Sequence, residues 1–306
     1  MLKRIIGFLH RSKSSINFIG FHYFIIACLA RLSVALKLRN VSNYLFKKYN
    51  NRIQKYLHEN YSRCLLASSN YGANPIDLQG NIWVLWWQGE DEAPSIIKSC
   101  IDSIRKNSNF HNVVVLNKFN FRDYANLPTF ILDKFNKGKI SIQQLSDIIR
   151  LYLLSHYGGM WLDASIYLIK PLDSSIFKSK IYTAQTNGSK WCGFYLGGSK
   201  HTPLFSLAYN MICAYWRKED SLLDYFLIDH IIQYIYNHHD DTKKLIDGLP
   251  SLNNDILFFS YNANKPFNET KYNSLMSKNT AFKLTWKKQL NKNHNSFGGY
   301  LLNSMH

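Results

Sequence analysis

The sequence predicts an α/β protein in which helices flank a mixed, mainly parallel sheet, with a helical extension at the N-terminus. Short apolar runs at 82–87, 113–116 and 160–163 have the length and composition of buried strands. Segments with helical spacing of apolar residues separate these runs, and strand, helix and strand in succession imply a parallel unit with a right-handed crossover. The N-terminal region differs, because cations alternate there with apolar runs.

Length and composition bound the organisation of the chain. With 306 residues, 46% of them apolar and 15% aromatic, the chain can hold one sizeable core with an appendage. We expect a basic helical extension over residues 1–75 and an α/β domain over residues 76–306. The five cysteines are odd in number and form no C-x-x-C pair, which favours a reduced, cytosolic protein.

The net charge of +17 is concentrated at the N-terminus. Residues 1–63 contain twelve Lys or Arg and one acid, which leaves +11 in that segment and +6 in the remainder. Such a patch attracts nucleic acid or an anionic membrane. The apolar run at 16–30 has 15 residues, fewer than the roughly 20 that span a bilayer. We therefore expect two or three helices in residues 1–60 that bury one face on the α/β domain or lie in the membrane interface; the alternative is a helical extension with a solvated basic face.

The first half of the predicted sheet has clear boundaries. Ile82 to Trp87 form the first strand, and Gln88-Gly89 follow at its carboxyl end. Pro94 suits the first turn of a helix, which apolar residues continue at helical spacing to Ile104. Val113 to Leu116 form the next strand.

The central stretch carries the strongest local signals. Ser141 with Gln144 forms a capping box that starts a helix, and Gly158-Gly159 end it because a left-handed C-cap suits glycine. A buried strand from Met160 follows and leads to Asp163. This carboxylate therefore stands at the carboxyl end of a strand, where open α/β sheets bind ligands.

The remaining elements are less sharply marked. The pattern beyond Asp240 is typical of loops, and His238–Asp241 read as a solvated helix end rather than a metal cluster. No P-loop, dinucleotide fingerprint or nucleophile elbow occurs, which disfavours kinases, dehydrogenases and hydrolases. The other expected elements are strands at 181–184 and 192–196, a turn at Gly197-Gly198, a helix at Pro203–Tyr215 and a helix capped by Ser221.

Several motifs follow one another between about residues 80 and 302: Ile82–Gly89, Ala93-Pro94, Gly138–Ser141, Asp147–Arg150, Tyr157–Asp163, Asp224–Asp229 and Gly299–Leu302. In this order they resemble the bacterial capsular polysaccharide synthesis family. That family is a GT-A glycosyltransferase group similar to the yeast outer-chain mannosyltransferases and the glucosylating domains of large clostridial toxins. The resemblance implies a GT-A-like fold, with a nucleotide-sugar half at about 80–185 and an acceptor half at 186–306.

The resemblance also implies roles for individual residues. Trp86 or Trp87 would stack on uracil; packing in the core is the alternative. Asp147 and Arg150 would hold the donor's sugar hydroxyls and diphosphate; an ion pair three residues apart on a helix is the alternative. Asp229 would lie near the anomeric carbon or the acceptor hydroxyl; a buried ion pair is the alternative. Further donor contacts are expected from Gln88, Gly89, Trp161, Ser165 and Ser296.

Metal use is the open question at this site. Relatives with a D-x-D pair bind Mn²⁺ or Mg²⁺, whereas Ser165 here stands in the place of the second Asp, and a hydroxyl is a weaker ligand. The resemblance therefore implies weak or conditional metal binding by Asp163, with help from His294. The alternative is that Arg150 and N-terminal cations neutralise the phosphates without metal.

The expected function is transfer of a sugar, with retention, from a UDP-linked donor to a lipid-linked capsule or O-antigen intermediate. The enzyme would be a peripheral protein at the cytoplasmic face of the plasma membrane. A non-catalytic nucleotide-sugar-binding protein or scaffold is the main alternative, because the D-x-D pair is incomplete. Nucleic-acid binding is disfavoured, because no recognition motif occurs and the charge lies outside the predicted sheet.

Overall fold

The computed structural model describes residues 15–66, 80–186, 188–200, 202–250, 254–287 and 295–303. The contacts divide the chain into two units. The first unit consists of residues 1–70, 127–148 and 203–243, and the second of residues 71–126, 149–202 and 244–306. The predicted domain boundary at 75/76 lies outside the described residues and stays a prediction.

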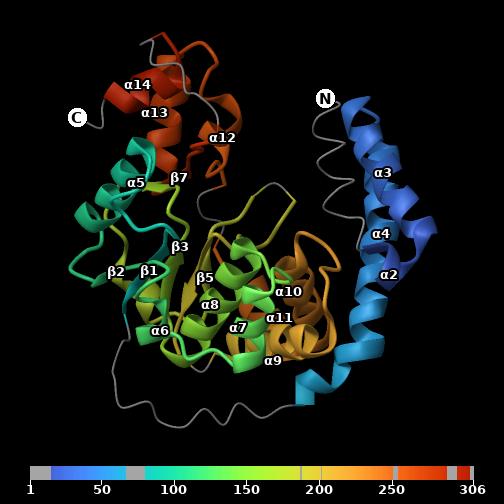
Figure 1. The fold of residues 1–306 in the computed structure, drawn as a ribbon. Helices are drawn as coiled ribbons and strands as arrows, with labels where there is room; N and C mark the ends of the chain where they lie inside the picture. The colour runs from blue at the N-terminus through green and yellow to red at the C-terminus, as the bar shows by residue number, and fades with distance from the viewer. Residues whose placement is uncertain are drawn as a thin grey trace. The chain divides into compact units, whose positions relative to one another are not determined.

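The second unit contains a five-stranded sheet in the order β2-β1-β3-β6-β5 (Figure 1). Strand β1 is parallel to both β2 and β3, and β6 is antiparallel to both β3 and β5, so four strands share one direction. The predicted mixed, mainly parallel sheet is thus confirmed. The strands are β1 (Ile82–Leu85), β2 (Val113–Leu116), β3 (Gly159–Leu162), β5 (Tyr182–Thr183) and β6 (Tyr195–Gly198).

Helix α5 (Ser95–Lys106) connects β1 to β2, as the sequence predicts, and forms the main core of this unit with the sheet. Its apolar residues Ile97, Ile101 and Ile104 are fully buried together with residues of β1 and β3. The 3₁₀ helix η3 (Ser174–Phe177) also contributes to this core. A short helix, α6 (Phe121–Tyr124), follows β2.

Helix α8 (Ile142–His156) runs from the first unit into the second and leads directly to β3. The predicted capping box is present, since the Ser141 N–H donates to Gln144 Oε1 at 2.9 Å and the Gln144 N–H to Ser141 Oγ at 3.4 Å. Gly158 and Gly159 have φ of 71° and 90°. A Cβ on Gly159 would also lie 2.3 Å from the Asn81 carbonyl oxygen. This turn therefore requires glycine both for its positive φ and for the close approach of another backbone segment.

The predicted turn at Gly197-Gly198 is wrong, because both residues belong to β6. They pair with Gly159 and Met160 of β3, and a Cβ on Gly197 would lie 2.6 Å from the Gly159 carbonyl oxygen. These glycines therefore allow two backbones to approach closely rather than reversing the chain.

The expectation of loops beyond Asp240 is also wrong. Strand β7 pairs with β4 in a second, two-stranded sheet. Phe259, Leu275 and Phe282 are buried in a separate apolar cluster. The elements are β4 (Ile166–Leu168), β7 (Ala281–Lys283), α11 (Asp240–Asp247), α12 (Phe258–Asn262), α13 (Glu269–Lys278) and α14 (Phe297–Asn303).

The first unit is helical in the part that the structure describes. It includes the expected N-terminal helices, and none of the described helices is long and apolar enough to cross a bilayer. The helices lying wholly within it are α2 (Ile16–Ile19), α3 (Phe21–Ala35), α4 (Arg39–Tyr61), α7 (Thr129–Asn136), α9 (Pro203–Lys218) and α10 (Leu227–His238), with the 3₁₀ helix η2 (Ser62–Leu66).

The predicted helix start at Ser221 is wrong, since α10 begins only at Leu227. The Tyr215 hydroxyl donates to the Ser221 carbonyl oxygen at 2.7 Å, so that residue belongs to a bend. Asp224 is buried in the same bend. Its carboxylate accepts hydrogen bonds from the Tyr49 hydroxyl and the Phe226 N–H, both at 2.8 Å.

Candidate functional site

The carboxylate of Asp163 lies at the carboxyl end of β3, as the sequence predicts. Trp83 of β1 pairs with Trp161 of β3, so the two strands end side by side, and Asp163 directly follows Leu162. The Asp163 N–H donates to the Phe194 carbonyl oxygen at 3.0 Å, which fixes the backbone at this position. The side chain keeps 30% of its surface exposed, so it remains accessible to a ligand.

Two cations and an indole hold this carboxylate. Oδ1 accepts from Arg150 Nη2 at 3.2 Å and from Trp161 Nε1 at 3.0 Å, and Oδ2 accepts from Lys283 Nζ at 2.6 Å. Desolvation alone would raise the pKa of Asp163, but Lys283 and Arg150 outweigh it and hold the pKa below its usual range. Asp163 is therefore ionised at neutral pH.

The guanidinium of Arg150 is enclosed. Arg150 lies on α8, its side chain is 7% exposed, and its Cζ atom is 4.9 Å from the centroid of the Trp161 ring. A Cβ on Gly193 would lie 3.2 Å from its Nη1 atom, so a larger residue there would crowd the guanidinium. Arg150 is thus held rigidly. Asp147 lies three residues earlier on the same helix and is partly buried.

Sequence reasoning missed Lys283, the second cation. Strand β7 places it, because Lys283 is paired with Ile166 of β4 and the Leu284 N–H donates to the Ser165 carbonyl oxygen at 2.8 Å. Its ammonium is also 4.4 Å from the centroid of the Phe194 ring. The available signal was the alternation of Phe282 and Leu284 with a cation between them, which is typical of a half-buried strand.

The tryptophans at the end of β1 lie in different surroundings. Trp86 contacts Trp286 edge to face, with ring centroids 5.5 Å apart, and Trp87 contacts Phe121 at the same distance. The indole N–H of Trp86 is enclosed and has no acceptor among the described residues. An enclosed donor of this kind costs about 1–3 kcal/mol if it stays without an acceptor.

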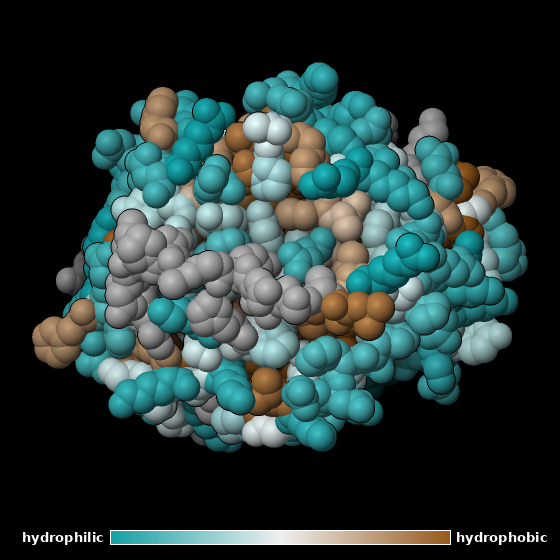
Figure 2. Space-filling model, turned by 90° about the horizontal axis from the view of Figure 1, so that it is seen from below, coloured by the Kyte–Doolittle hydropathy of each residue, from teal (hydrophilic) through white to brown (hydrophobic). Residues whose placement is uncertain are grey.

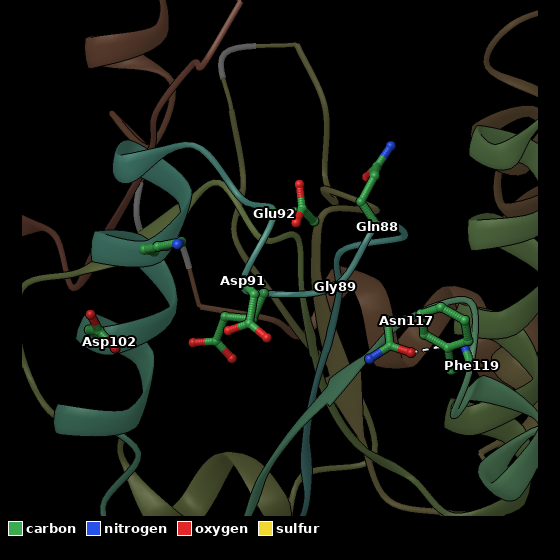
Figure 3. Close-up of a pocket in the computed structure, with 9 residues that line it drawn as sticks. Gln88, Gly89, Asp91, Glu92, Asp102, Asn117 and Phe119 are labelled. Atoms are coloured by element: carbon green, nitrogen blue, oxygen red, sulfur yellow. Dashed lines mark hydrogen bonds between the residues drawn. The ribbon is translucent and has the colours of Figure 1, made fainter.

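A hollow of about 570 Å³ lies at the carboxyl ends of β1 and β2. Figure 3 shows Asp91 and Glu92 on the segment after β1, Asp102 on α5, and Asn117 and Phe119 after β2. Its lining also contains Gln88, Gly89, Glu90 and Lys98. Two predicted donor contacts thus line this hollow, whereas Asp163, Arg150 and Lys283 do not.

Among the other predicted site residues, Trp161 and Ser296 have structural partners. Trp161 is 1% exposed and holds Asp163 through its N–H. Ser296 is buried and caps α14, its hydroxyl accepting from the Gly299 N–H at 3.0 Å. Asp229 lies in the first turn of α10, and His294 lies outside the described residues. Their roles in binding a donor stay predictions.

The residues at Asp163 do not fit a divalent metal ion. Both carboxylate oxygens already accept from cations or an N–H, and Ser165 brings no carboxylate. An ion about 2.1 Å from Oδ2 would lie within about 5 Å of the Lys283 ammonium, which is 2.6 Å from the same oxygen. In the part of the chain that the structure describes, no group of three or more His, Cys, Asp or Glu side chains is arranged to hold a metal.

Comparison with known proteins identifies the family. The model of a family described as "Capsular polysaccharide synthesis protein" matches residues 34–301. The chain belongs to this family. The resemblance predicted from the motifs is thereby confirmed, and the match begins earlier than residue 80, inside α3.

Among solved structures, this capsular polysaccharide synthesis protein is similar to the PaToxG glycosyltransferase. The two chains are 18% identical, and the alignment covers 66% of this chain and 84% of that one, with a TM-score of 0.40. No curated protein sequence matches the chain.

Proposed function

We propose that this family member is a glycosyltransferase of capsular polysaccharide synthesis. It transfers a hexosyl group from a nucleotide-sugar donor, UDP-linked as the motif resemblance implies, to a lipid-linked capsule or O-antigen intermediate. The observation that carries the proposal is Asp163, an ionised carboxylate held by two cations at the carboxyl end of a central strand in a chain of this family. Ligands of open α/β sheets bind at this edge.

The chemistry that we propose follows from the charges. Transfer breaks the bond between the anomeric carbon and the diphosphate oxygen, so negative charge grows on the leaving group, and fixed cations stabilise it. Retention, which the resemblance implies, without a covalent glycosyl-enzyme intermediate requires the acceptor oxygen to attack from the face that the diphosphate leaves. The proton of the acceptor hydroxyl then passes to the departing phosphate oxygen, and no protein nucleophile is needed.

Activity on a panel of nucleotide sugars tests this function. We expect the purified protein to hydrolyse or transfer from at least one of them, and that donor to raise the melting temperature. Asp163→Ala and Arg150→Ala should each lose at least about tenfold in kcat/KM with an unchanged circular dichroism spectrum. Asp123→Asn, an exposed carboxylate on α6, is the matched control and should stay active. Saturable binding without turnover would instead favour the non-catalytic binder.

We further propose that helix α3 holds the protein at the cytoplasmic face of the plasma membrane, where a lipid-linked acceptor would be found. Phe21, Ile25, Leu29, Leu32 and Leu36 are 39–62% exposed and recur at three- and four-residue spacing, so they form one stripe along α3. Residues 15–58 contain no Asp or Glu. The exposed cations Lys37, Arg39, Lys47 and Lys48 follow the stripe in the sequence. An apolar stripe with cations and no acid fits an anionic lipid surface.

One face of the molecule offers a contrast. On the face that Figure 2 shows, hydrophilic residues predominate and hydrophobic residues form small, separate groups. The stripe, by comparison, places five exposed apolar side chains in one line along α3 and its C-cap.

Co-sedimentation with vesicles tests the membrane proposal. The double variant Leu29→Glu/Leu32→Glu should weaken binding to phosphatidylglycerol vesicles by about tenfold or more, because each inserted leucine contributes of order 1 kcal/mol. Leu66→Glu changes a leucine that is 85% exposed outside the stripe and should bind as the wild type does. Equal binding of the wild type and the double variant would contradict the proposal.

A further inference from the structure

The carboxylate of Asp163 at the end of β3 lies between two cations. Arg150 and Lys283 contribute two cations, and Asp163 contributes one anion, so the three side chains carry a net charge of +1. A divalent ion needs oxygen ligands, and both oxygens of Asp163 already accept hydrogen bonds here. Two cations beside one carboxylate are suited to an anionic ligand instead.

The two cations differ in their freedom to move. The Arg150 guanidinium lies over the Trp161 ring and its side chain is 7% exposed, so it has little room to turn. The Lys283 side chain is 23% exposed and ends in an ammonium on a flexible stem. Its backbone is fixed by the pairing of β7 with β4, while its tip can leave Oδ2 and reach a ligand beside Asp163.

We propose that Lys283 takes the place of the divalent metal ion at this site. This inference rests on the proposed glycosyl transfer. The ammonium of Lys283 binds the phosphate oxygens of a nucleoside diphosphate and stabilises the negative charge that they gain as the bond to the anomeric carbon breaks. The electron pair of that bond leaves with the diphosphate, and Lys283 keeps its proton throughout. Asp163 is the positioning residue that holds the ammonium before the donor binds.

Lys283→Met tests the proposal, because it keeps an unbranched side chain of similar size and removes the ammonium with its charge. With the best donor found in the panel, and in excess EDTA, we expect the wild type to keep its kcat within about twofold. Lys283→Met should lose about 100-fold in kcat, the usual cost of removing one group that stabilises a developing anion. Lys283→Arg should recover at least about tenfold of this loss, since it restores the charge.

The matched control is Lys287→Met, which removes an exposed cation four residues later in the chain and should keep its kcat within about twofold. Ligand binding separates a charge effect from damage to the fold. Titration calorimetry should find UDP binding to Lys283→Met weakened about tenfold or more, with uridine binding unchanged, because uridine carries no phosphate.

The outcomes are distinct. Loss of wild-type activity in EDTA with recovery in Mn²⁺ would overturn the role of Lys283 and leave the glycosyltransferase proposal intact. Full activity of Lys283→Met, or equal weakening of UDP and uridine, would overturn it as well. A wild type that binds neither UDP nor any nucleotide sugar would overturn both proposals.

Discussion

Replacing Asp163 by Asn removes one negative charge from the ion cluster and keeps the size of the side chain. The substitution leaves Arg150 and Lys283, whose side chains are 7% and 23% exposed, without the carboxylate between them. Removing one partner from a fully buried ion pair costs about 3–5 kcal/mol. Because Asp163 and Lys283 retain contact with solvent, water replaces part of the lost interaction. We therefore expect a loss of about 2 kcal/mol in the free energy of unfolding near pH 7.

The loss should depend on pH in one direction. The pKa of Asp163 is lowered in the folded state by Lys283 and Arg150 against the opposing effect of desolvation, so the unfolded chain takes up the proton first as the pH falls. The contribution of Asp163 is complete above its unfolded pKa of about 3.9 and is lost as the pH falls through the lower folded value. The variant lacks this titration, so its stability should approach that of the wild type below about pH 4.

Urea unfolding followed by tryptophan fluorescence between pH 3 and pH 8 measures both effects. Asp123→Asn, an exposed carboxylate of the same unit, is the control and should change the free energy of unfolding by less than about 0.5 kcal/mol. Equal stability of Asp163→Asn and the wild type at pH 7 would show that the ion cluster does not stabilise the fold. A difference that stays constant down to pH 3 would contradict the role of the ionised carboxylate.

Three further substitutions, one of them with a matched control, test other parts of the structure. Gly159→Ala should lower the free energy of unfolding by more than about 3 kcal/mol, since its Cβ would lie 2.3 Å from a backbone carbonyl oxygen and φ is 90°. Its control is Gly138→Ala, where φ is 70° and the space is open, which should cost about 1 kcal/mol; thermal unfolding measures both. Trp86→Phe removes an enclosed N–H, so the free energy of unfolding should change by less than about 1 kcal/mol. An unchanged KM for the donor in this variant would contradict a role of Trp86 in donor binding. Tyr49→Phe should cost about 1–3 kcal/mol by chemical denaturation, because the buried carboxylate of Asp224 loses a hydrogen bond of 2.8 Å; a neutral result would mean that water replaces the hydroxyl.

Local signals were sufficient where neighbouring residues determine the backbone. The capping box at Ser141 predicts the start of α8, and the glycine pair at Gly158-Gly159 with the apolar run that follows predicts its end and the start of β3. Asp163 follows from them, because its place depends only on where that strand ends. The family motifs lie in these same segments, which is why the sequence also predicts the family.

Features that depend on distant segments were missed. Gly197 and Gly198 are typical of a turn when read alone, and only the approach of β3 explains why a strand needs them. Lys283 lies 120 residues after Asp163, and its pairing with Asp163 follows from the register of β7 on β4. Such registers are set by tertiary packing, which short-range periodicity does not report.

The same ion pair that positions Lys283 also bears on release of the product. Under the proposed role, the carboxylate of Asp163 and the phosphates of the ligand compete for one ammonium, which is 2.6 Å from Oδ2 when no ligand is bound. Departure of the diphosphate then re-forms this ion pair, so the cost of losing the phosphate contacts is partly offset within the protein. Asp163→Asn removes the competitor. If the proposal holds, the variant should bind UDP more tightly than the wild type even as kcat falls, a split that weakened folding alone would not produce.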